Sequence, residues 1–127
     1  MPPSQLRERT KVFAIDVVDL CRRLPKTEEG LIVRRQLLRS GTSVGANYRA
    51  VCRPRSDADF ISKLGTVIEE CDETAFWLEL AIDIHLAVEK QVSKLLLEAD
   101  ELLRIFVASR ETVRRRLRQR RPARAHT

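Results

Sequence analysis

The sequence predicts an all-α protein built as an antiparallel four-helix bundle with up-down-up-down order. Hydrophobic residues make up 43% of its 127 residues and charged residues 33%, with only 4 glycines and 5 prolines. This balance, in a chain whose length suits one domain, is typical of helical proteins. Four segments carry apolar residues at helical spacing, and none alternates apolar and polar residues as a strand does. The short connections between the segments favour antiparallel neighbours.

The first helix is predicted to start near Gln5 and to end before Pro25, because the residue preceding a proline is driven out of the α region. Its apolar face is formed by residues at helical spacing, namely Leu6, Phe13, Val17, Leu20 and Leu24. The polar residues between them fall on other faces.

Thr27 is the predicted N-cap of the second helix, and the acidic pair that follows suits its first turn. Its apolar stripe is predicted to comprise Val33, Leu37, Ser40, Val44, Asn47 or Tyr48, and Val51. Gly41 and Gly45 together cost roughly 2 kcal/mol relative to alanine in a helix interior. We prefer close helix packing as the reason for them, with a kink or a partner-binding notch as the alternative.

Pro54 interrupts the pattern, and Ser56 or Asp57 is the expected cap of the third helix. The apolar face of this helix is sustained for about 25 residues, roughly 38 Å. It comprises Phe60, Ile61, Leu64, Val67, Ile68, Cys71, Ala75, Leu78, Ile82 and His85. The opposite face is acidic and carries Glu69, Glu70, Asp72, Glu73 and Glu79.

The turn before the fourth helix is predicted between Val88 and Ser93, with Ser93 as a candidate cap. The expected apolar stripe is Leu96, Ala99, Leu103, Phe106, Val113 and Leu117, flanked by Leu95 and Leu102. The bundle is assigned to residues 1–118. Residues 119–127 form an arginine-rich tail that we expect to be disordered.

The net charge of +6 is unevenly distributed along the chain. From Arg110 onward there are eight arginines and one acid, whereas the preceding 109 residues carry 16 basic and 17 acidic side chains. The folded body is therefore close to neutral. The three cysteines match no zinc spacing, and we find no signal peptide and no apolar run of the roughly 18 residues that span a bilayer. We therefore expect reduced thiols, a cytoplasmic location and no membrane contact.

No catalytic arrangement is evident, so we predict a protein that is not an enzyme and needs no cofactor, metal or small-molecule substrate. His85 is interpreted as a helix-end or core histidine rather than a catalyst. Glu69 and Glu73 are spaced to bridge a metal, but no Glu-x-x-His partner accompanies them, which favours a solvated acidic face.

Two groups of residues are candidates for interaction. Asn47 could set the helix register or contact a ligand, and Trp77 lies in a segment that is apolar around most of the helix, which suggests subunit contact. The oligomer or core-register candidates are Ser43, Asn47, Tyr48 and Trp77. The nucleic-acid-binding candidates are Arg34, Arg35, Arg39, Arg114, Arg115, Arg116 and Arg118. The arginines near the C-terminus could neutralise phosphates, or they could form a solvated end that favours the helix dipole.

The segment LLRSGTSVGANYRA at residues 37–50 resembles the signature of the bacterial S23 ribosomal proteins, some of which are encoded by intervening sequences in 23S rRNA genes. Residues 24–26, 59–65, 69–74 and 77–80 resemble the same family. The similarity covers roughly Val12 to Val107, with Gly45 where many members carry proline, and the arginine-rich end lies outside it.

This resemblance implies an antiparallel four-helix bundle that assembles into a homopentameric ring and has no known enzymatic activity. A relative with this fold, the accessory protein of diversity-generating retroelements, forms a ring that binds a reverse transcriptase and nucleic acid. We therefore expect a homo-oligomeric interaction scaffold whose first partner is another copy of itself. The alternative is an RNA-binding protein that uses its basic helix faces and arginine-rich end.

Overall fold

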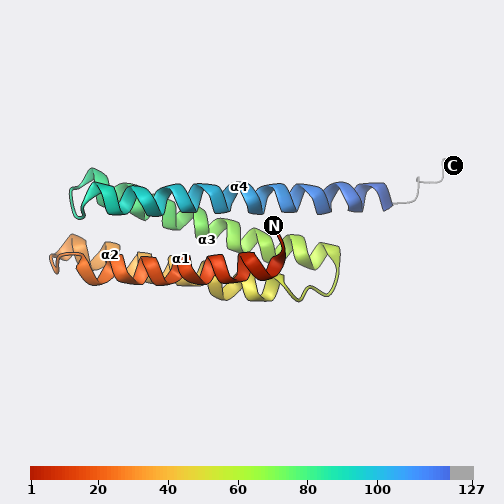
Figure 1. Ribbon diagram of the computed structural model, residues 1–127, viewed down its shortest axis with the longest axis horizontal. Coiled ribbons are helices and arrows are strands. Elements are labelled where there is room, and N and C mark those ends of the chain that lie inside the picture. The colour runs from red at the N-terminus through yellow and green to blue at the C-terminus, as the bar shows by residue number, and fades with distance from the viewer. Residues whose placement is uncertain (121–127) are drawn as a thin grey trace.

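The computed structural model describes residues 1–120, which form four helices and no strand. Helix α1 spans Pro3–Arg23, α2 spans Glu28–Val51, α3 spans Asp57–Asp83 and α4 spans Glu89–Arg120. The predicted all-α fold class with four helices is confirmed. Figure 1 shows the helices side by side, with the end of α4 projecting past the others.

Most helix ends follow the local chemistry of the sequence. α1 begins at Pro3, earlier than predicted, because proline is tolerated in the first turn of a helix. The Thr27 hydroxyl accepts the Gly30 amide at 3.1 Å, which confirms Thr27 as the cap of α2. Ser56 caps α3, since its hydroxyl accepts the Asp59 amide at 3.0 Å.

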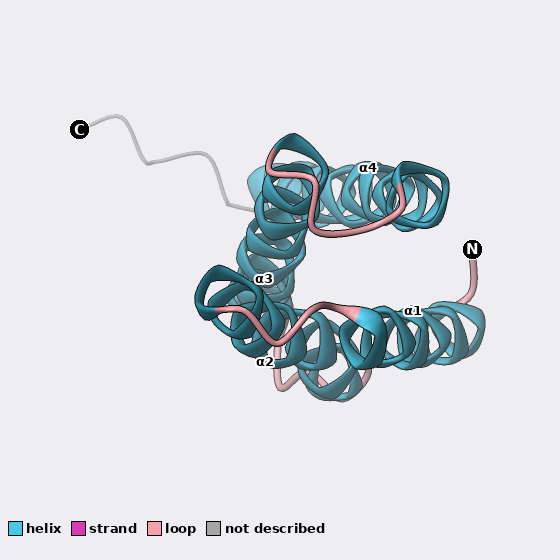
Figure 2. Cartoon of the chain, turned by 90° about the vertical axis from the view of Figure 1, so that its left-hand side faces the viewer, coloured by secondary structure: helices cyan, strands magenta, loops and turns pink. Residues whose placement is uncertain are grey.

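The helices form a square with three tight edges and one loose edge. α1 packs along α2, α2 along α3 and α3 along α4, whereas α1 and α4 touch only narrowly. Figure 2 shows this arrangement from the end of the bundle, with the open edge between α1 and α4. The edge shared by α2 and α3 therefore lies opposite the loose one.

The core is mostly aliphatic, as the low aromatic content requires. The predicted apolar face of α1 is buried throughout, and so is that of α2, with Tyr48 rather than Asn47 on the stripe. On α3 the buried line runs through Leu64, Val67, Cys71, Thr74, Ala75, Leu78 and Ala81. Of the four predicted residues spaced seven apart, only Ala75 lies on this buried line. The other three, Ile61, Ile68 and Ile82, flank the line and are half-buried.

The small residues of α2 allow close contact with α1. A β-carbon added at Gly45 would lie 3.1 Å from the carbonyl oxygen of Thr10, and one added at Gly41 would overlap the side chain of Val17. The two glycines fit because their hydrogen side chains let the helix backbones approach. Close packing is therefore the reason for both glycines.

The connection between α3 and α4 differs from the prediction. α3 ends at Asp83, and His85 then adopts a left-handed conformation with φ of 58°. The Leu86 amide donates to the Ala81 carbonyl and the His85 amide to the Ile82 carbonyl, a pattern that closes a helix C-terminus without glycine. α4 starts at Glu89, so Ser93 lies inside the helix and is not a cap, and His85 is exposed in the turn rather than on the α3 face.

The buried stripe of α4 contains the predicted Ala99, Phe106 and Val113 and differs from the prediction at its other positions. Its buried residues are Val92, Leu95, Ala99, Leu102, Phe106 and Val113. Leu96, Leu103 and Leu117 are half-buried beside them, and at the first two positions the preceding leucine, Leu95 or Leu102, is the buried one. The helix continues through Arg120, and residues 121–127 of the predicted tail lie outside the described residues.

Candidate interaction surfaces

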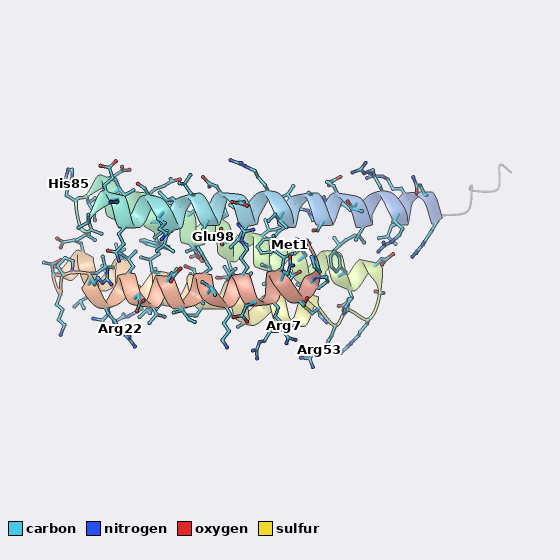
Figure 3. The ribbon with its side chains drawn as sticks, viewed as in Figure 1. Met1, Arg7, Arg22, Arg53, His85 and Glu98 are labelled. Atoms are coloured by element: carbon cyan, nitrogen blue, oxygen red, sulfur yellow. The ribbon has the colours of Figure 1, made fainter. Side chains whose placement is uncertain are left out.

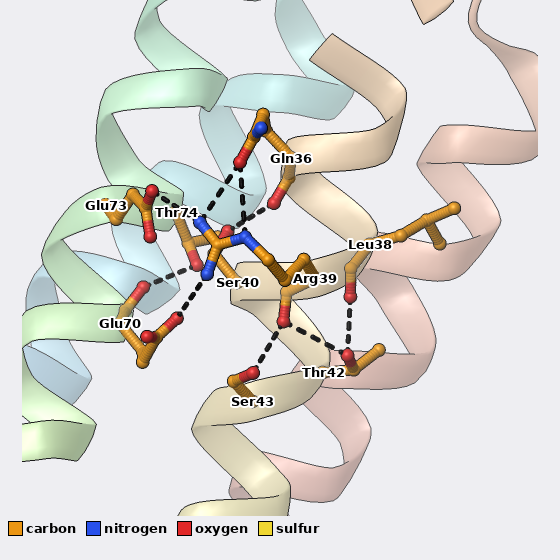
Figure 4. Close-up of polar contacts among 9 residues, drawn as sticks. All are labelled: Gln36, Leu38, Arg39, Ser40, Thr42, Ser43, Glu70, Glu73 and Thr74. Carbon is orange, nitrogen blue, oxygen red and sulfur yellow. Dashed lines mark hydrogen bonds and ion pairs between the residues drawn. The ribbon is translucent and has the colours of Figure 1, made fainter. Parts of the chain in front are cut away.

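Arg39 is held in an ion cluster between α2 and α3. Its guanidinium donates to Gln36 Oε1 at 3.1 and 3.2 Å and to Glu70 Oε2 at 3.3 Å, and it also pairs with Glu73 (Figure 4). The hydrogen bond with Glu73 is the main cause of the raised pKa of Arg39. Arg39, a candidate for nucleic-acid contact, is thus already neutralised by two carboxylates of its own chain.

The hydroxyls of the small-residue segment satisfy carbonyls within α2. Ser43 Oγ donates to the Arg39 carbonyl at 2.7 Å and Ser40 Oγ to the Gln36 carbonyl at 2.8 Å (Figure 4). In such bonds the hydroxyl donates to a carbonyl one turn earlier in its own helix and not to a group outside the helix. Ser43 is half-buried, and its hydroxyl is directed along its own helix.

Tyr48 lies in the core. Its ring stacks on Phe106 of α4 with centroids 5.6 Å apart, and burial raises the pKa of its hydroxyl to about 12. Asn47 is half-buried beside the stripe. Of these two neighbouring candidates, Tyr48 is the one in the core, where its ring reaches across the bundle to Phe106.

The basic candidates of α4 are divided between ion pairs and solvent. Arg116 donates to both oxygens of Asp57 at 3.0 and 3.2 Å, and Arg120 reaches the same carboxylate at 2.7 Å. This hydrogen bonding lowers the pKa of Asp57, and it ties α4 to the start of α3. Arg114 pairs with Glu111 within its own helix at 3.1 Å. Arg115 and Arg118 are exposed.

The remaining two basic candidates lie on α2. Arg34 is half-buried, and its backbone carbonyl accepts the Cys21 thiol at 3.7 Å. Arg35 is exposed one position further along the helix. The structure does not gather the seven basic candidates into one surface, because three come from residues 34–39 of α2 and four from residues 114–118 near the far end of α4.

An apolar patch lies on the edge shared by α2 and α3. Ile32 is 53% exposed and Phe76 is 54% exposed. Trp77 and Leu80 are half-buried, and the Trp77 ring meets Phe76 edge to face with centroids 5.1 Å apart. The Trp77 Nε1 is buried without an acceptor within residues 1–120, which is costly for a polar group. We call Ile32, Phe76, Trp77 and Leu80 the α2–α3 patch.

The register of the two helices brings the members of this patch together. Arg39 fixes the register through its contacts with Glu70 and Glu73. Figure 1 shows α2 and α3 running in opposite directions, so two turns back along α2 corresponds to two turns forward along α3. Ile32 lies seven residues before Arg39, and residues 77 and 80 lie seven after the two glutamates. Ile32 is therefore beside Trp77 and Leu80.

A groove follows the loose edge between α1 and α4. Its cavity of about 460 Å³ is lined by Asp16, Asp19, Arg23, Gln91, Lys94, Leu95, Leu97, Glu98 and Glu101. Leu97 is 71% exposed, and Val12 and Ile15 are exposed on α1. Arg9 bridges the two helices through Glu98 Oε2 at 2.8 Å and Oε1 at 2.6 Å, and Figure 3 shows Glu98 between α4 and α1. We call these nine lining residues the α1–α4 groove.

A basic groove lies on the outer side of α1 and α2. One cavity of about 270 Å³ is lined by Arg7, Arg49, Cys52 and Arg53. A second, of about 330 Å³, shares two of these arginines and is lined by Arg7, Lys11, Ala14, Thr42, Gly45, Ala46 and Arg49. Figure 3 shows Arg7 and Arg53 along this side of the molecule. We call Arg7, Lys11, Arg49 and Arg53 the α1–α2 basic groove.

Sequence reasoning missed this basic groove because its two halves lie about forty residues apart. Arg7 and Lys11 are four residues apart, as are Arg49 and Arg53, so each pair lies on one helix face. That spacing was the available signal. The spacing predicts a shared groove only if these faces of α1 and α2 are known to be neighbours. The close contact between Gly45 and Thr10 in the structure shows that they are.

The described residues contain no group of three or more histidine, cysteine or carboxylate side chains positioned to hold a metal ion. None of the four helices is both long and apolar enough to cross a bilayer. Cys21 and Cys71 are buried, and burial raises their pKa values to about 11 and about 12. These thiols donate to carbonyls of neighbouring helices, so they are part of the packing.

Comparison with known proteins identifies the family. The sequence profile of the 23S rRNA-intervening sequence protein family matches residues 4–108. The chain belongs to that family. A crystal structure of a protein of unknown function from the S23 ribosomal protein family of Bacteroides thetaiotaomicron is similar, with 31% identity and a TM-score of 0.80 over 87% of this chain and 99% of that chain. A search of curated protein sequences gives no match.

Membership of the 23S rRNA-intervening sequence protein family confirms the resemblance found in the sequence. The matched residues 4–108 contain the α2–α3 patch, the α1–α4 groove and the α1–α2 basic groove. The basic end of α4 beyond residue 108 lies outside the match.

Proposed function

We propose that this chain is a non-enzymatic, homo-oligomeric scaffold of the cytoplasm whose copies meet through the α2–α3 patch. The observation that carries the proposal is the exposure of Ile32 and Phe76, on neighbouring helices, beside the half-buried Trp77. Large aromatic and aliphatic side chains grouped on a surface are characteristic of protein interfaces. We take the assembly to be the homopentameric ring that the family resemblance implies.

A second copy is the occupant we favour because the charges beside the patch have both signs. Arg35 is exposed on the α2 side, whereas Asp72 and Glu79 are exposed on the α3 side. A surface with both signs can be matched by another copy of the same chain. Complementary charge also orients such partners during association.

The test compares Phe76→Asp with Val88→Asp as the control, by light scattering and native mass spectrometry. Val88 is 70% exposed but lies in the loop before α4, away from the patch. We expect wild type and V88D to be oligomers and F76D to be a monomer with unchanged helix content. Truncating a central interface residue typically weakens binding by more than about tenfold. A wild-type protein that is monomeric at micromolar concentration would refute the scaffold.

RNA binding is the second candidate function, and the α1–α2 basic groove is the observation that favours it. Its cavities are lined by three arginines and a lysine with no carboxylate among the lining residues. The floor is made of small residues, so a backbone phosphate could approach the helices closely. Four phosphate contacts would give a salt slope of about −3 for a single strand.

This second function is tested by titrating salt in a filter-binding assay with a single-stranded RNA. Arg49→Gln should reduce the magnitude of the slope by about 0.7. Arg22→Gln is the control, because Arg22 is on α1 outside the groove and pairs with Asp19. Cys52 also lines the groove and is the only half-buried cysteine, so bound RNA should slow its alkylation. Binding that is unchanged by R49Q would exclude this groove as the site.

A further inference from the structure

We propose that the α1–α4 groove is the receptor for the α2–α3 patch of a second copy, so that the copies associate head to tail. This inference rests on the proposed scaffold function and adds the identity of the second half of the interface. It also assigns a function to the groove, for which the packing within a single bundle gives no explanation.

The two surfaces lie on opposite edges of the bundle. α2 packs tightly on α3, and the α1–α4 edge across the square is the loose one (Figure 2). A patch on one edge cannot reach a groove on the other within one molecule. It can reach the groove of a neighbour, and a contact between two different surfaces repeats from copy to copy until the copies close into a ring.

The two surfaces also lie at the same height along the bundle. Ile32 is in the second turn of α2 and Leu80 is in the last turn of α3. The groove is lined by the second half of α1, from Asp16 to Arg23, and by the first half of α4, from Gln91 to Glu101. All four segments adjoin the loops at residues 24–27 and 84–88. Copies aligned side by side therefore place patch against groove without a shift along the helices.

Side-by-side placement fixes which helices meet. When copies repeat around an axis parallel to the helices, α2 of one copy faces α1 of the next and α3 faces α4. Arg35 of α2 then faces the groove acids Asp16 and Asp19, and Glu79 of α3 faces Lys94. The charges at these two positions are thus opposite, and the other groove acids, Glu98 and Glu101, are already paired with Arg9.

The apolar parts match in the same placement. Phe76 projects from α3 and is 54% exposed, and Leu97 on α4 is 71% exposed. The groove volume of about 460 Å³ falls in the range of roughly 300–1,000 Å³ that holds small ligands, so it has room for an aromatic side chain. The contact would cover both residues, together with Ile32 and Ile15.

The experiment uses two variants that each block one surface. Leu97→Asp blocks the groove and leaves the patch intact, whereas Phe76→Asp blocks the patch and leaves the groove intact. Both side chains are exposed, so neither change disturbs the core. Each variant alone should be a monomer, with assembly weakened by more than about tenfold. Mixed in equal amounts, they should form one-to-one dimers and nothing larger, because only one intact patch and one intact groove can meet.

The outcomes separate this inference from the scaffold proposal. If L97D assembles like wild type while F76D is monomeric, the groove is not the receptor and the scaffold proposal survives. If L97D alone forms dimers, the patch pairs with itself around a two-fold axis and the inference is wrong. If the wild type is monomeric, the scaffold proposal fails first. Native mass spectrometry of variants with different tags distinguishes all three results.

A pair of charge variants provides an independent check that does not alter the apolar residues. Asp19→Arg and Arg35→Glu should each weaken assembly, since each places like charges across the contact. The mixture should associate more tightly than either variant alone, because the carboxylate introduced by R35E then meets the guanidinium introduced by D19R. A mixture that associates no better than the single variants would contradict this placement of α2 against α1.

Discussion

A β-carbon added at Gly41 would lie 2.7 Å from Cγ1 and 3.0 Å from Cγ2 of Val17, whose side chain is fully buried. Hydrogen is therefore the only side chain that fits at this position without a shift of Val17. The contact sets how closely α1 and α2 pack, so a substitution at Gly41 should be felt in the stability of the bundle.

We expect Gly41→Ala to lower the free energy of unfolding by about 1 kcal/mol. Overpacking costs about 1–3 kcal/mol, and the better helix propensity of alanine returns about 1 kcal/mol. Gly65→Ala is the matched control, because nothing lies within 4 Å of its added β-carbon, and it should gain about 1 kcal/mol. Urea unfolding of both variants measures the difference. A more stable G41A would contradict the close contact.

The Arg9–Glu98 pair should stabilise the loose edge. The side chains are only 21% and 30% exposed, and two hydrogen bonds join them. A double-mutant cycle with alanine should give a coupling energy of about 1 kcal/mol that falls with added salt. The control pair Arg22–Asp19 is 3.8 Å apart and mostly exposed, and its coupling should be under about 0.5 kcal/mol. Equal coupling in both pairs would count against the bridge.

Stability should decline at alkaline pH. Burial raises the pKa of the Cys21 thiol to about 11 and that of the Cys71 thiol to about 12, from an ordinary value of 9.0. The folded protein then keeps protons that the unfolded chain releases, so this stabilisation is complete below pH 9 and is lost as pH rises towards 11 and 12. Urea unfolding from pH 8 to 11 should show a steeper loss for wild type than for Cys21→Ala/Cys71→Ala. Parallel curves would exclude the thiols as the cause. (Tyr48 contributes in the same direction in both proteins.)

His85→Gly should raise the free energy of unfolding by about 0.5–1 kcal/mol. The left-handed conformation at φ of 58° costs an L-residue roughly 1–2 kcal/mol, and glycine adopts it freely at some cost in entropy. The side chain is exposed, so little packing is lost. His85→Val should be destabilising, because a β-branched residue tolerates this conformation poorly. Thermal unfolding at one pH checks both, and a destabilised H85G would show that the imidazole itself matters.

Sequence patterning predicted the fold well where a stripe is read from one helix alone. Leu6, Phe13 and Val17 were placed correctly because the face of α1 is narrow and ends at a proline. On α4 the pattern was ambiguous, since Leu95 and Leu96, like Leu102 and Leu103, are adjacent. Only contact with α3 decides which of each pair is buried.

The turn after α3 and the candidate surfaces depended on information that periodicity does not contain. His85 adopts a left-handed conformation that glycine usually occupies, so the residue type at this position did not predict the turn. The sequence made Arg39 a candidate for binding phosphate. The structure shows that Glu70 and Glu73 lie beside it and pair with its guanidinium. The sequence singled out Trp77 for contact beyond the core, and the structure places it half-buried against Phe76. Its neighbour Ile32 became evident only from the register of α2 and α3.

The chain enters α1 and leaves α4 at the end of the bundle that holds the α2–α3 loop, whereas the patch and the α1–α4 groove adjoin the other two loops (Figure 1). An attachment before Pro3 or after Arg120 would therefore be remote from both surfaces. Fluorophores, affinity handles or whole cargo proteins joined at these positions should be displayed together at one rim of an assembly without obstructing it. The protein is thus suited to use as a carrier that presents several fused copies of a chosen domain.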